Sequence, residues 1–179
     1  MSKNVILVDK EDRPLGVMPK LEAHQKGLLH RAFSIFIFNT KGELLLQKRA
    51  DHKYHTPGLW TNACCSHQVE GEDIQIGLSR RLNEEMGMDI KTFEKAFDFI
   101  YHAKLDNGLT EYELDHVYFA MSDQSPSPNP AEVSEWKYLQ SSKVKQEVDR
   151  LPQLYTPWFK LLLEPVLNKY RSGQFIFNK

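Results

Sequence analysis

Two pairs of side chains, each spaced by two positions, are of types that bind metals in proteins. The first pair is Cys65 and His67, and the second is Glu111 and Glu113. Alternate residues of a β-strand point to the same face, so each pair should share a face if its segment is extended. Neighbouring carboxylates repel each other. The glutamates therefore either line a solvated strand face or share a bound cation.

Histidines upstream extend this candidate metal site. His24 and His30 add two imidazoles to His67, and three imidazoles with two carboxylates suit Mn²⁺, Mg²⁺ or Zn²⁺. A single histidine is more often a surface or core residue than a ligand. In an alternative site, Cys65 would ligate zinc beside the histidines and leave the two glutamates without a purpose. Four further histidines show no matching role: His52, His55, His102 and His116.

Residues 66–88 have the spacing of a known metal-binding helix. The segment SHQVEGEDIQIGLSRRLNEEMGM resembles the Nudix box, G-x5-E-x7-R-E-U-x-E-E-x-G-U, in which U is apolar. Two positions depart from the pattern, because Ser66 replaces the first glycine and Arg81 replaces the glutamate after the arginine. The positions in register are Glu72, Arg80, Leu82, Glu84, Glu85, Gly87 and Met88.

The departure at Arg81 carries chemical information. Arg81 and Glu85 are four positions apart and should share a helical face. In Nudix hydrolases this face gathers metals through several carboxylates and activates a water molecule. A guanidinium weakens multi-metal binding and adds a planar phosphate donor. The helix is therefore predicted to hold a diphosphate, with Mg²⁺ bridging Glu85 and the phosphates, without hydrolysing it.

Two further segments carry a narrower resemblance, which covers nearly the whole chain. Residues 60–67, WTNACCSH, are similar to the cysteine motif of type I isopentenyl diphosphate isomerases, and residues 110–114, TEYEL, are similar to their glutamate motif. The resemblance implies interconversion of isopentenyl and dimethylallyl diphosphate. It implies Cys65 and Glu113 as the acid and base, without setting their order, and Tyr101 as an assistant. It also raises His24, His30 and His67 from isolated histidines to expected metal ligands.

The resemblance also implies how the substrate is held. A carbocation needs a dry pocket with electron-rich faces, for which Trp60 and Trp158 are candidates. Their alternative role is core packing. The family's anion-binding positions correspond to Lys20, Arg49, Lys53 and Arg81. Solvent exposure is nearly as plausible a role for Lys53 taken alone.

The elements that must position these residues predict an α/β (α+β layered) domain, with a mixed sheet flanked by helices, over residues 1–179. Apolar periodicity predicts helices at 73–87 and 142–151, and a third that Thr156 caps and Pro157 begins. Gly87 should end the first helix, and Pro165 should kink the last. Residues 106–108 form a hairpin signal. Strands are expected at 5–8, 15–18, 33–38, 44–46, 60–67, 97–105, 109–121 and 136–139.

Bulk properties restrict the partners. Charges nearly cancel, with 23 Lys and Arg against 24 Asp and Glu, which argues against a broad nucleic-acid surface. Apolar runs are too short for a signal peptide or a membrane span, so we expect a cytoplasmic protein. Cys64 and Cys65 are expected to be free thiols, because a disulfide between neighbours would be strained. We also expect a monomer that binds a small diphosphate.

Two rival functions follow from the same residues. A Nudix hydrolase of diphosphates would use the helix at 73–87, although Arg81 argues against it. A non-enzymatic zinc-binding module would use Cys65 and the histidines, and chelation would then unfold it.

Overall fold

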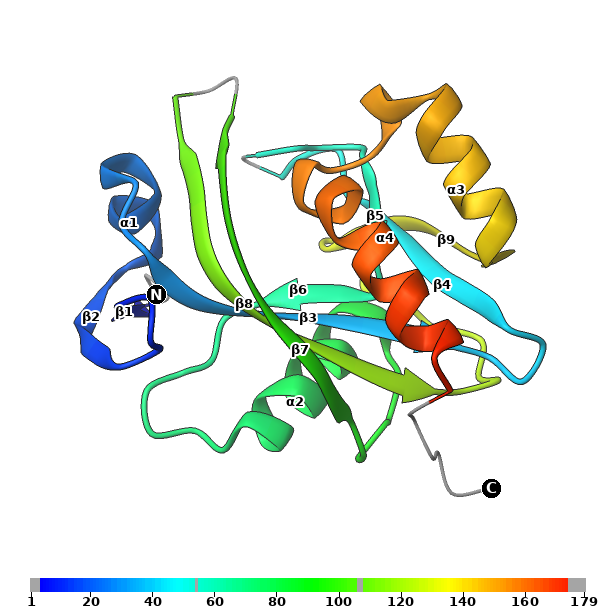
Figure 1. Ribbon diagram of the computed structural model, residues 1–179, viewed down its shortest axis with the longest axis horizontal. Coiled ribbons are helices and arrows are strands. Elements are labelled where there is room, and N and C mark those ends of the chain that lie inside the picture. Colours follow the sequence, from blue (N-terminus) through cyan, green and yellow to red (C-terminus); the bar gives the residue numbers. More distant parts are fainter. Residues whose placement is uncertain (1–3, 54, 106–107, 174–179) are drawn as a thin grey trace.

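The computed structural model describes residues 4–53, 55–105 and 108–173, and it has a mixed sheet with helices on both faces (Figure 1). Strand β3 pairs in parallel with β8, whereas the other pairings of named strands are antiparallel. The strands are β1 Asn4–Val8, β2 Pro14–Pro19, β3 His30–Phe38, β4 Glu43–Arg49, β5 Trp60–Asn62, β6 Cys64–Ser66, β7 Glu94–Lys104, β8 Thr110–Met121 and β9 Val133–Gln140. The helices are α1 Lys20–Lys26, α2 Ile74–Met86, α3 Ser141–Arg150 and α4 Pro157–Arg171, with a 3-10 turn η1 at Pro152–Leu154.

The α/β fold class and the three predicted helices are confirmed. Helix α2 begins after Asp73, whose carboxylate accepts from the backbone of the first turn, and it ends at Gly87 in the left-handed conformation. Helix α4 continues through Pro165 to Arg171. Thr156 occupies the N-cap position, but the prediction that it caps is wrong: its hydroxyl donates to Thr61 Oγ1 at 3.1 Å.

Two local features differ from the sequence-based expectation, and a third agrees with it. Helix α1 was not expected, because its seven residues are too few for a clear apolar period. The expected strand at 60–67 is divided at Ala63, with β5 pairing with β4 and β6 pairing with β3. Antiparallel pairing of β7 with β8 confirms the hairpin, although Asp106 and Asn107 of its predicted turn lie outside the described residues.

Alternation along β3 builds two cores, one on each face of the sheet. Phe36 and Phe38 pack with residues of α3 and α4, whereas Ile35 and Ile37 pack with residues of α2. Both sets are fully buried, as expected for a strand covered on two faces. The strand therefore cannot shift by one residue without exchanging its two apolar sets.

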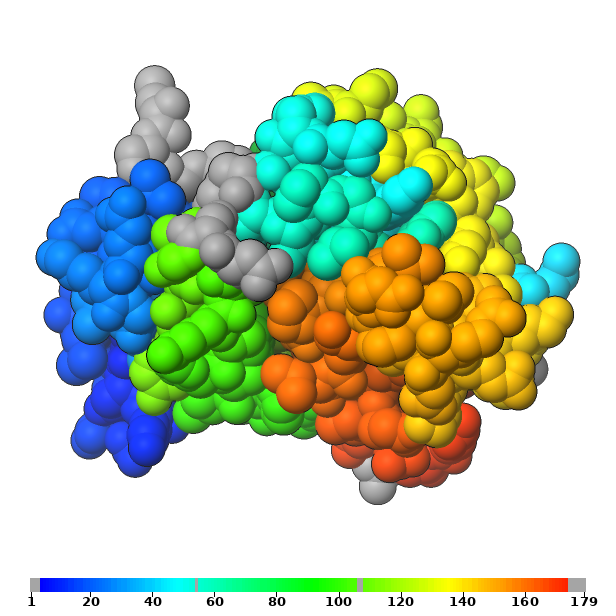
Figure 2. Space-filling model, turned by 90° about the horizontal axis from the view of Figure 1, so that it is seen from above, coloured from blue at the N-terminus to red at the C-terminus, as the bar shows by residue number. Residues whose placement is uncertain are grey.

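The register of three neighbouring strands brings polar residues together at one end of the sheet. His30 of β3 lies beside Glu113 of β8, and Glu113 lies beside Tyr101 of β7. On the other side of β3, Ser34 lies beside Cys65 of β6. Figure 2 shows the blue N-terminal residues against the green β7–β8 hairpin, with the orange C-terminal helices on the opposite side. Within the described residues, no helix combines the length and apolar character needed to span a bilayer.

The C-terminal end of α2 is anchored to the loop before β9. Backbone N–H groups of Ser127 and Asn129 donate to the carbonyls of Met86 and Glu85, both at 2.9 Å. Gly87 has φ +62, and a Cβ built there would lie 2.2 Å from the Ser127 carbonyl oxygen. Only glycine therefore permits this approach.

Replacing Gly87 with alanine should destabilise the fold by more than its backbone conformation alone requires. Gly42 is a matched control, since its φ is +72 and a Cβ there would meet nothing within 4 Å. Gly42→Ala should cost about 1–2 kcal/mol for the left-handed conformation. Gly87→Ala should cost roughly a further 1–3 kcal/mol because the added methyl overlaps backbone. Urea unfolding of both variants measures the difference, and equal losses would show that the loop moves aside freely.

Candidate active site

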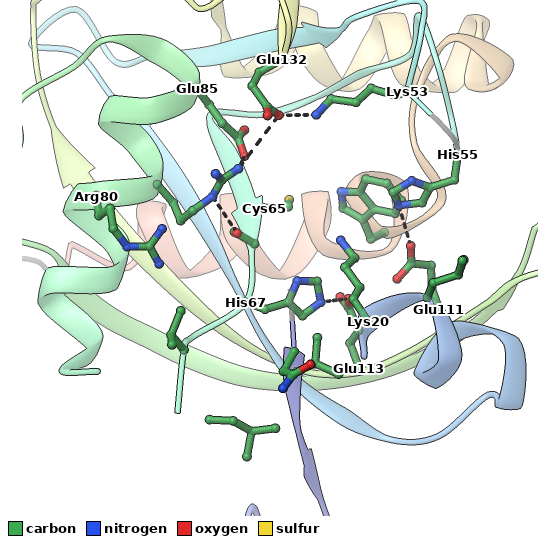
Figure 3. Close-up of a pocket in the computed structure, with 18 of the residues that line it drawn as sticks. Lys20, Lys53, His55, Cys65, His67, Arg80, Glu85, Glu111, Glu113 and Glu132 are labelled. Carbon is green, nitrogen blue, oxygen red and sulfur yellow. Dashed lines mark hydrogen bonds and ion pairs between the residues drawn. The ribbon is translucent and has the colours of Figure 1, made fainter. Parts of the chain in front are cut away.

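A cavity of about 850 Å³ opens where α1, β6, α2 and the β7–β8 hairpin meet (Figure 3). Most residues selected from the sequence line it. They are Lys20, Arg49, Lys53, Cys65, His67, Arg81, Glu85, Tyr101, Glu111, Glu113 and Trp158. The cavity therefore combines acids, bases, cations and an aromatic face within one space.

Four side chains, of which two line the cavity, converge closely enough to hold a metal ion. They are His24, His30, His67 and Glu113, whose ligand atoms all lie within 4.8 Å of one another. His67 Nε2 lies 2.9 Å from Glu113 Oε1, and His30 Nε2 lies 3.4 Å from the same oxygen. The separate elements α1, β3 and β8 each contribute to this group, with His67 immediately after β6.

Backbone carbonyls set the proton positions of two of these imidazoles. His24 Nδ1 lies 3.1 Å from the Thr110 carbonyl oxygen, and His30 Nδ1 lies 2.8 Å from that of Leu28. A carbonyl only accepts, so each Nδ1 carries the proton and each Nε2 presents a lone pair. Both Nε2 atoms are buried without a hydrogen-bond partner within the described part of the chain. A cation at their meeting point would satisfy them, so the residues fit a metal.

Burial keeps the imidazoles of His24 and His67 neutral, which is the form that a cation requires. Desolvation, reinforced by Lys20, lowers the pKa of His24 to about 4 and that of His67 to about 3. Desolvation and Glu113 together raise the pKa of Glu111 well above its usual range. Glu111 Oε2 lies 3.5 Å from His24 Nδ1, just outside the four-residue group. The buried Glu111 carboxylate is therefore costly to ionise until positive charge compensates it.

The Cys65 thiol is surrounded by hydrogen-bond acceptors. Its Sγ lies 3.0 Å from Asn62 Oδ1, and the Asn62 amide N–H groups donate to the carbonyls of Ile35 and Cys64, which fixes the orientation of the amide. Ser34 Oγ lies 3.4 Å from the sulfur and donates its own proton to Asp115 Oδ2 at 2.7 Å. Desolvation and Asp115 raise the pKa of Cys65 to about 12. The resting sulfur is therefore a protonated thiol.

Glu113 is surrounded by donors instead. Tyr101 Oη donates to its Oε2 at 2.5 Å, and His67 lies against its other oxygen. The ring of Trp158 also lines the cavity, and its indole N–H donates to Thr61 Oγ1 at 3.0 Å. The cavity thus places a proton donor, Cys65, and a proton acceptor, Glu113, around one space.

The opposite side of the cavity carries the cationic residues. Arg81 of α2 is buried and pairs with Glu85, and its Nε donates to Ser66 Oγ at 2.9 Å. Glu85 also accepts from Gln47 at 3.0 Å. Lys53 forms an ion pair with Glu132. The guanidinium carbon of Arg49 lies 5.6 Å from the Trp158 ring centroid.

This chain matches a known domain family, and it is similar in sequence to known proteins over most of its length. The NUDIX domain family matches residues 28–160. The isopentenyl-diphosphate Delta-isomerase 2 of Photorhabdus laumondii is 50% identical over 163 residues, which is 91% of this chain and 92% of that protein. The isopentenyl-diphosphate Delta-isomerase of Pectobacterium atrosepticum is 48% identical over 157 residues, covering 88% and 87%.

The chain belongs to the isopentenyl-diphosphate Delta-isomerase family of NUDIX-domain proteins. Solved structures agree on the fold. A crystal structure from Deinococcus radiodurans superposes with a TM-score of 0.74 at 18% identity, over 91% of this chain and 98% of that one. The MutT protein of Methanosarcina mazei gives 0.63 at 17% identity, over 82% and 96%. The resemblance in the two short motifs and the altered box therefore extends over most of the chain.

Within this family fold, the charges of the box are paired with one another along and beside α2. Arg81 contacts both Glu84 and Glu85, and Arg80 donates to Glu72 at 2.7 Å and to Glu84 at 3.1 Å. Two arginines thus pair with the three box carboxylates.

Some predicted residues lie outside the positions proposed for them. Trp60 does not line the cavity: it packs against the core beside α4, and Lys137 Nζ lies 4.5 Å from its ring centroid. The alternative in which Cys65 ligates zinc also fails, because Cys65 is not in the four-residue group and its sulfur contacts Asn62 and Ser34. Both cysteines are free, as expected, and Cys64 faces the opposite core.

Three residues of the site were missed from the sequence. Ser34 and Asp115 lie behind the thiol, and His55 contacts Glu111 Oε1 at 3.0 Å. Ser34 and Asp115 are separated by 81 positions, and His55 lies in an irregular segment. No local pattern could have joined these pairs, because each contact depends on tertiary structure.

Removing one of the converging imidazoles should abolish tight metal binding. His30→Gln deletes a lone pair aimed into the group and should weaken Mn²⁺ binding by more than about 100-fold, beyond the range typical of residues that support ligands. Electron paramagnetic resonance of free Mn²⁺ measures the affinity. His102→Gln is a control, because His102 is exposed on β7. An unchanged affinity in His30→Gln would place the cation elsewhere.

Proposed function

We propose that the protein interconverts isopentenyl diphosphate and dimethylallyl diphosphate by adding one proton and removing another. The observation that carries this proposal is the pairing of a donor-state thiol, Cys65, with an acceptor-state carboxylate, Glu113, in one cavity. The named isomerases that resemble this chain over about nine-tenths of its length support the same reaction. The place of the reaction is isoprenoid biosynthesis.

The two proton transfers balance without a further reactant. The Cys65 S–H bond breaks as its proton joins the terminal methylene carbon of isopentenyl diphosphate, which leaves a tertiary carbocation. A carbon–hydrogen bond on the neighbouring internal methylene then breaks, its electron pair forms the new double bond, and Glu113 takes the proton. Exchange with water restores the thiol and the carboxylate.

The surroundings stabilise the cation and control proton positions. The Trp158 ring supplies an electron-rich face, and Tyr101 holds the Glu113 oxygen that is not against His67. Asn62 and Ser34 hold the sulfur between two acceptors, so the S–H group stays protonated until an alkene displaces one of them. The contacts to Cys65 and Glu113 therefore help to set where the transferred protons are held.

We further propose Mn²⁺, with Zn²⁺ or Mg²⁺ as alternatives, for His24, His30, His67, Glu113 and the adjacent Glu111. The mixed nitrogen and oxygen donor set is the basis. Such an ion supplies positive charge that lowers the basicity of Glu113 and fixes its orientation. A second ion, Mg²⁺, would lie at Glu85 and contact the diphosphate.

The diphosphate is proposed to bind along the cationic side of the cavity. Lys20, Arg49, Lys53 and Arg81 all line it. Loss of water lowers the pKa of Lys20, an effect that Glu111 and Glu113 oppose. Arriving phosphates would exchange with the glutamates that now pair with Lys53 and Arg81. We also propose, from the sequence alone, that the protein is a monomer with a single domain. We further propose that it lies in the cytoplasm and binds no nucleic acid.

Cys65→Ala should lower kcat by at least about 100-fold, the lower end of what a positioned acid contributes, because the proton donor is lost. Proton NMR in deuterated water with Mg²⁺, Mn²⁺ and isopentenyl diphosphate should show the terminal methylene signal disappear with the wild type. Dimethylallyl signals should grow with deuterium incorporation. Metal content should stay near that of the wild type, because Cys65 is not a ligand.

Cys64→Ala is the matched control for this experiment. It removes the same atom one position away, but that sulfur is buried in the core beneath α2. The control should retain isomerisation. Full activity in Cys65→Ala would remove the thiol from the mechanism, and release of phosphate or pyrophosphate by the wild type would favour the rival hydrolase.

A further inference from the structure

His55 joins the cationic side of the cavity to the metal group. Its ring is 7% exposed and lies between Arg49 and Glu111, as Figure 3 shows for the Glu111 contact. Nδ1 lies 3.3 Å from an Arg49 guanidinium nitrogen, and Nε2 lies 3.0 Å from Glu111 Oε1. The ring centroid lies 6.0 Å from those of both His24 and Trp158.

The direction of both hydrogen bonds follows from the chemistry of the partners. A guanidinium has donors and no acceptor, so Nδ1 of His55 must accept from Arg49. A neutral imidazole has one donor, which must then be the Nε2–H group that points at Glu111. Arg49 is itself tethered, since it donates to the carbonyls of His55 at 3.2 Å and Thr56 at 3.1 Å. The chain Arg49–His55–Glu111 therefore has a single polarity.

This polarity determines which oxygen of Glu111 is left for a second partner. Oε1 accepts from His55, whereas Oε2 lies 3.5 Å from His24 Nδ1 and is the oxygen that remains for a cation. Glu111 has 2% exposure, so water contributes little to holding its carboxylate. The Nε2 of His55 carries a proton in this arrangement and is therefore not itself a lone-pair donor to a cation.

We propose that His55 is a positioning residue that orients Glu111 as a single-oxygen ligand and so sets the affinity of the metal site. The inference rests on the proposed function only in taking that group as the metal site. Groups that support ligands through one hydrogen bond typically change metal affinity by about 10- to 100-fold when removed. A residue that merely filled space would act through its volume rather than through an N–H group.

Two isosteric variants separate these roles. In His55→Gln, the amide nitrogen can occupy the place of Nε2 and donate to Glu111. In His55→Asn, the shorter side chain reaches only the place of Nδ1, where its amide oxygen can accept from Arg49, and no N–H group reaches Glu111. His55→Asn should therefore weaken Mn²⁺ binding by about 10- to 100-fold, whereas His55→Gln should restore it to within about threefold of the wild type.

The affinity is measured by electron paramagnetic resonance of free Mn²⁺, without substrate, after thermal unfolding has shown that both variants fold. The same Mn²⁺ affinity in His55→Asn as in the wild type would overturn the inference. Equal loss in both variants would also overturn it, because His55 would then act as a direct ligand or a packing residue. Failure of the wild type to bind Mn²⁺ would instead refute the proposed metal site, and the inference with it.

Discussion

The parallel pairing of β3 with β8 is the constraint on which the candidate active site depends. It places His30 beside Glu113, and because β7 pairs with the other edge of β8, Tyr101 reaches the same carboxylate. The apolar residues of β3 alternate between two separate cores, so a slip of one residue would expose both sets to the wrong partners. Hydrophobic packing thereby holds the polar side chains in an arrangement that is unfavourable for them alone, because carboxylate oxygens and imidazole lone pairs lie close together and repel each other.

The site brings together buried ionisable groups whose charges are unfavourable without a bound partner. Glu111 and Glu113 are buried together, and His24 and His67 beside them are kept neutral by desolvation and by the neighbouring Lys20. Neutral imidazoles are competent ligands, whereas imidazolium groups are not. At the other end of the cavity, Arg81 neutralises the box helix and is paired with Glu85. The two ends thus have opposite needs, one for a cation and one for an anion, and a metal with a diphosphate supplies both.

Much of this arrangement could be predicted from sequence, where short-range periodicity controls geometry. The spacing of Glu111 and Glu113 predicted that they share a strand face, and both line the cavity. The register of the box predicted helix α2 and the shared face of Arg81 and Glu85, which form an ion pair. The orientation of Trp60 could not be predicted, because β5 breaks away from β6 at Ala63 and its ring packs against the core instead. The contact of His55 with Glu111 was missed for a different reason: it joins an irregular segment to a strand, and no period connects them. Roles assigned to individual side chains remain predictions that the variants above test.

The order in which these segments are synthesised has a consequence for folding. Ser34 and Asp115 are in hydrogen-bond contact across 81 positions of sequence, and the whole of β3 pairs with a strand that follows it at similar separation. During translation, a nascent chain carries the apolar residues 35–38 of β3 without their β8 partner until residues 110–121 have left the ribosome. Such non-local parallel pairing is slow to form and exposes strand edges meanwhile. The groups of the candidate active site therefore come together late in biogenesis, and until then the unpaired edge of β3 favours aggregation.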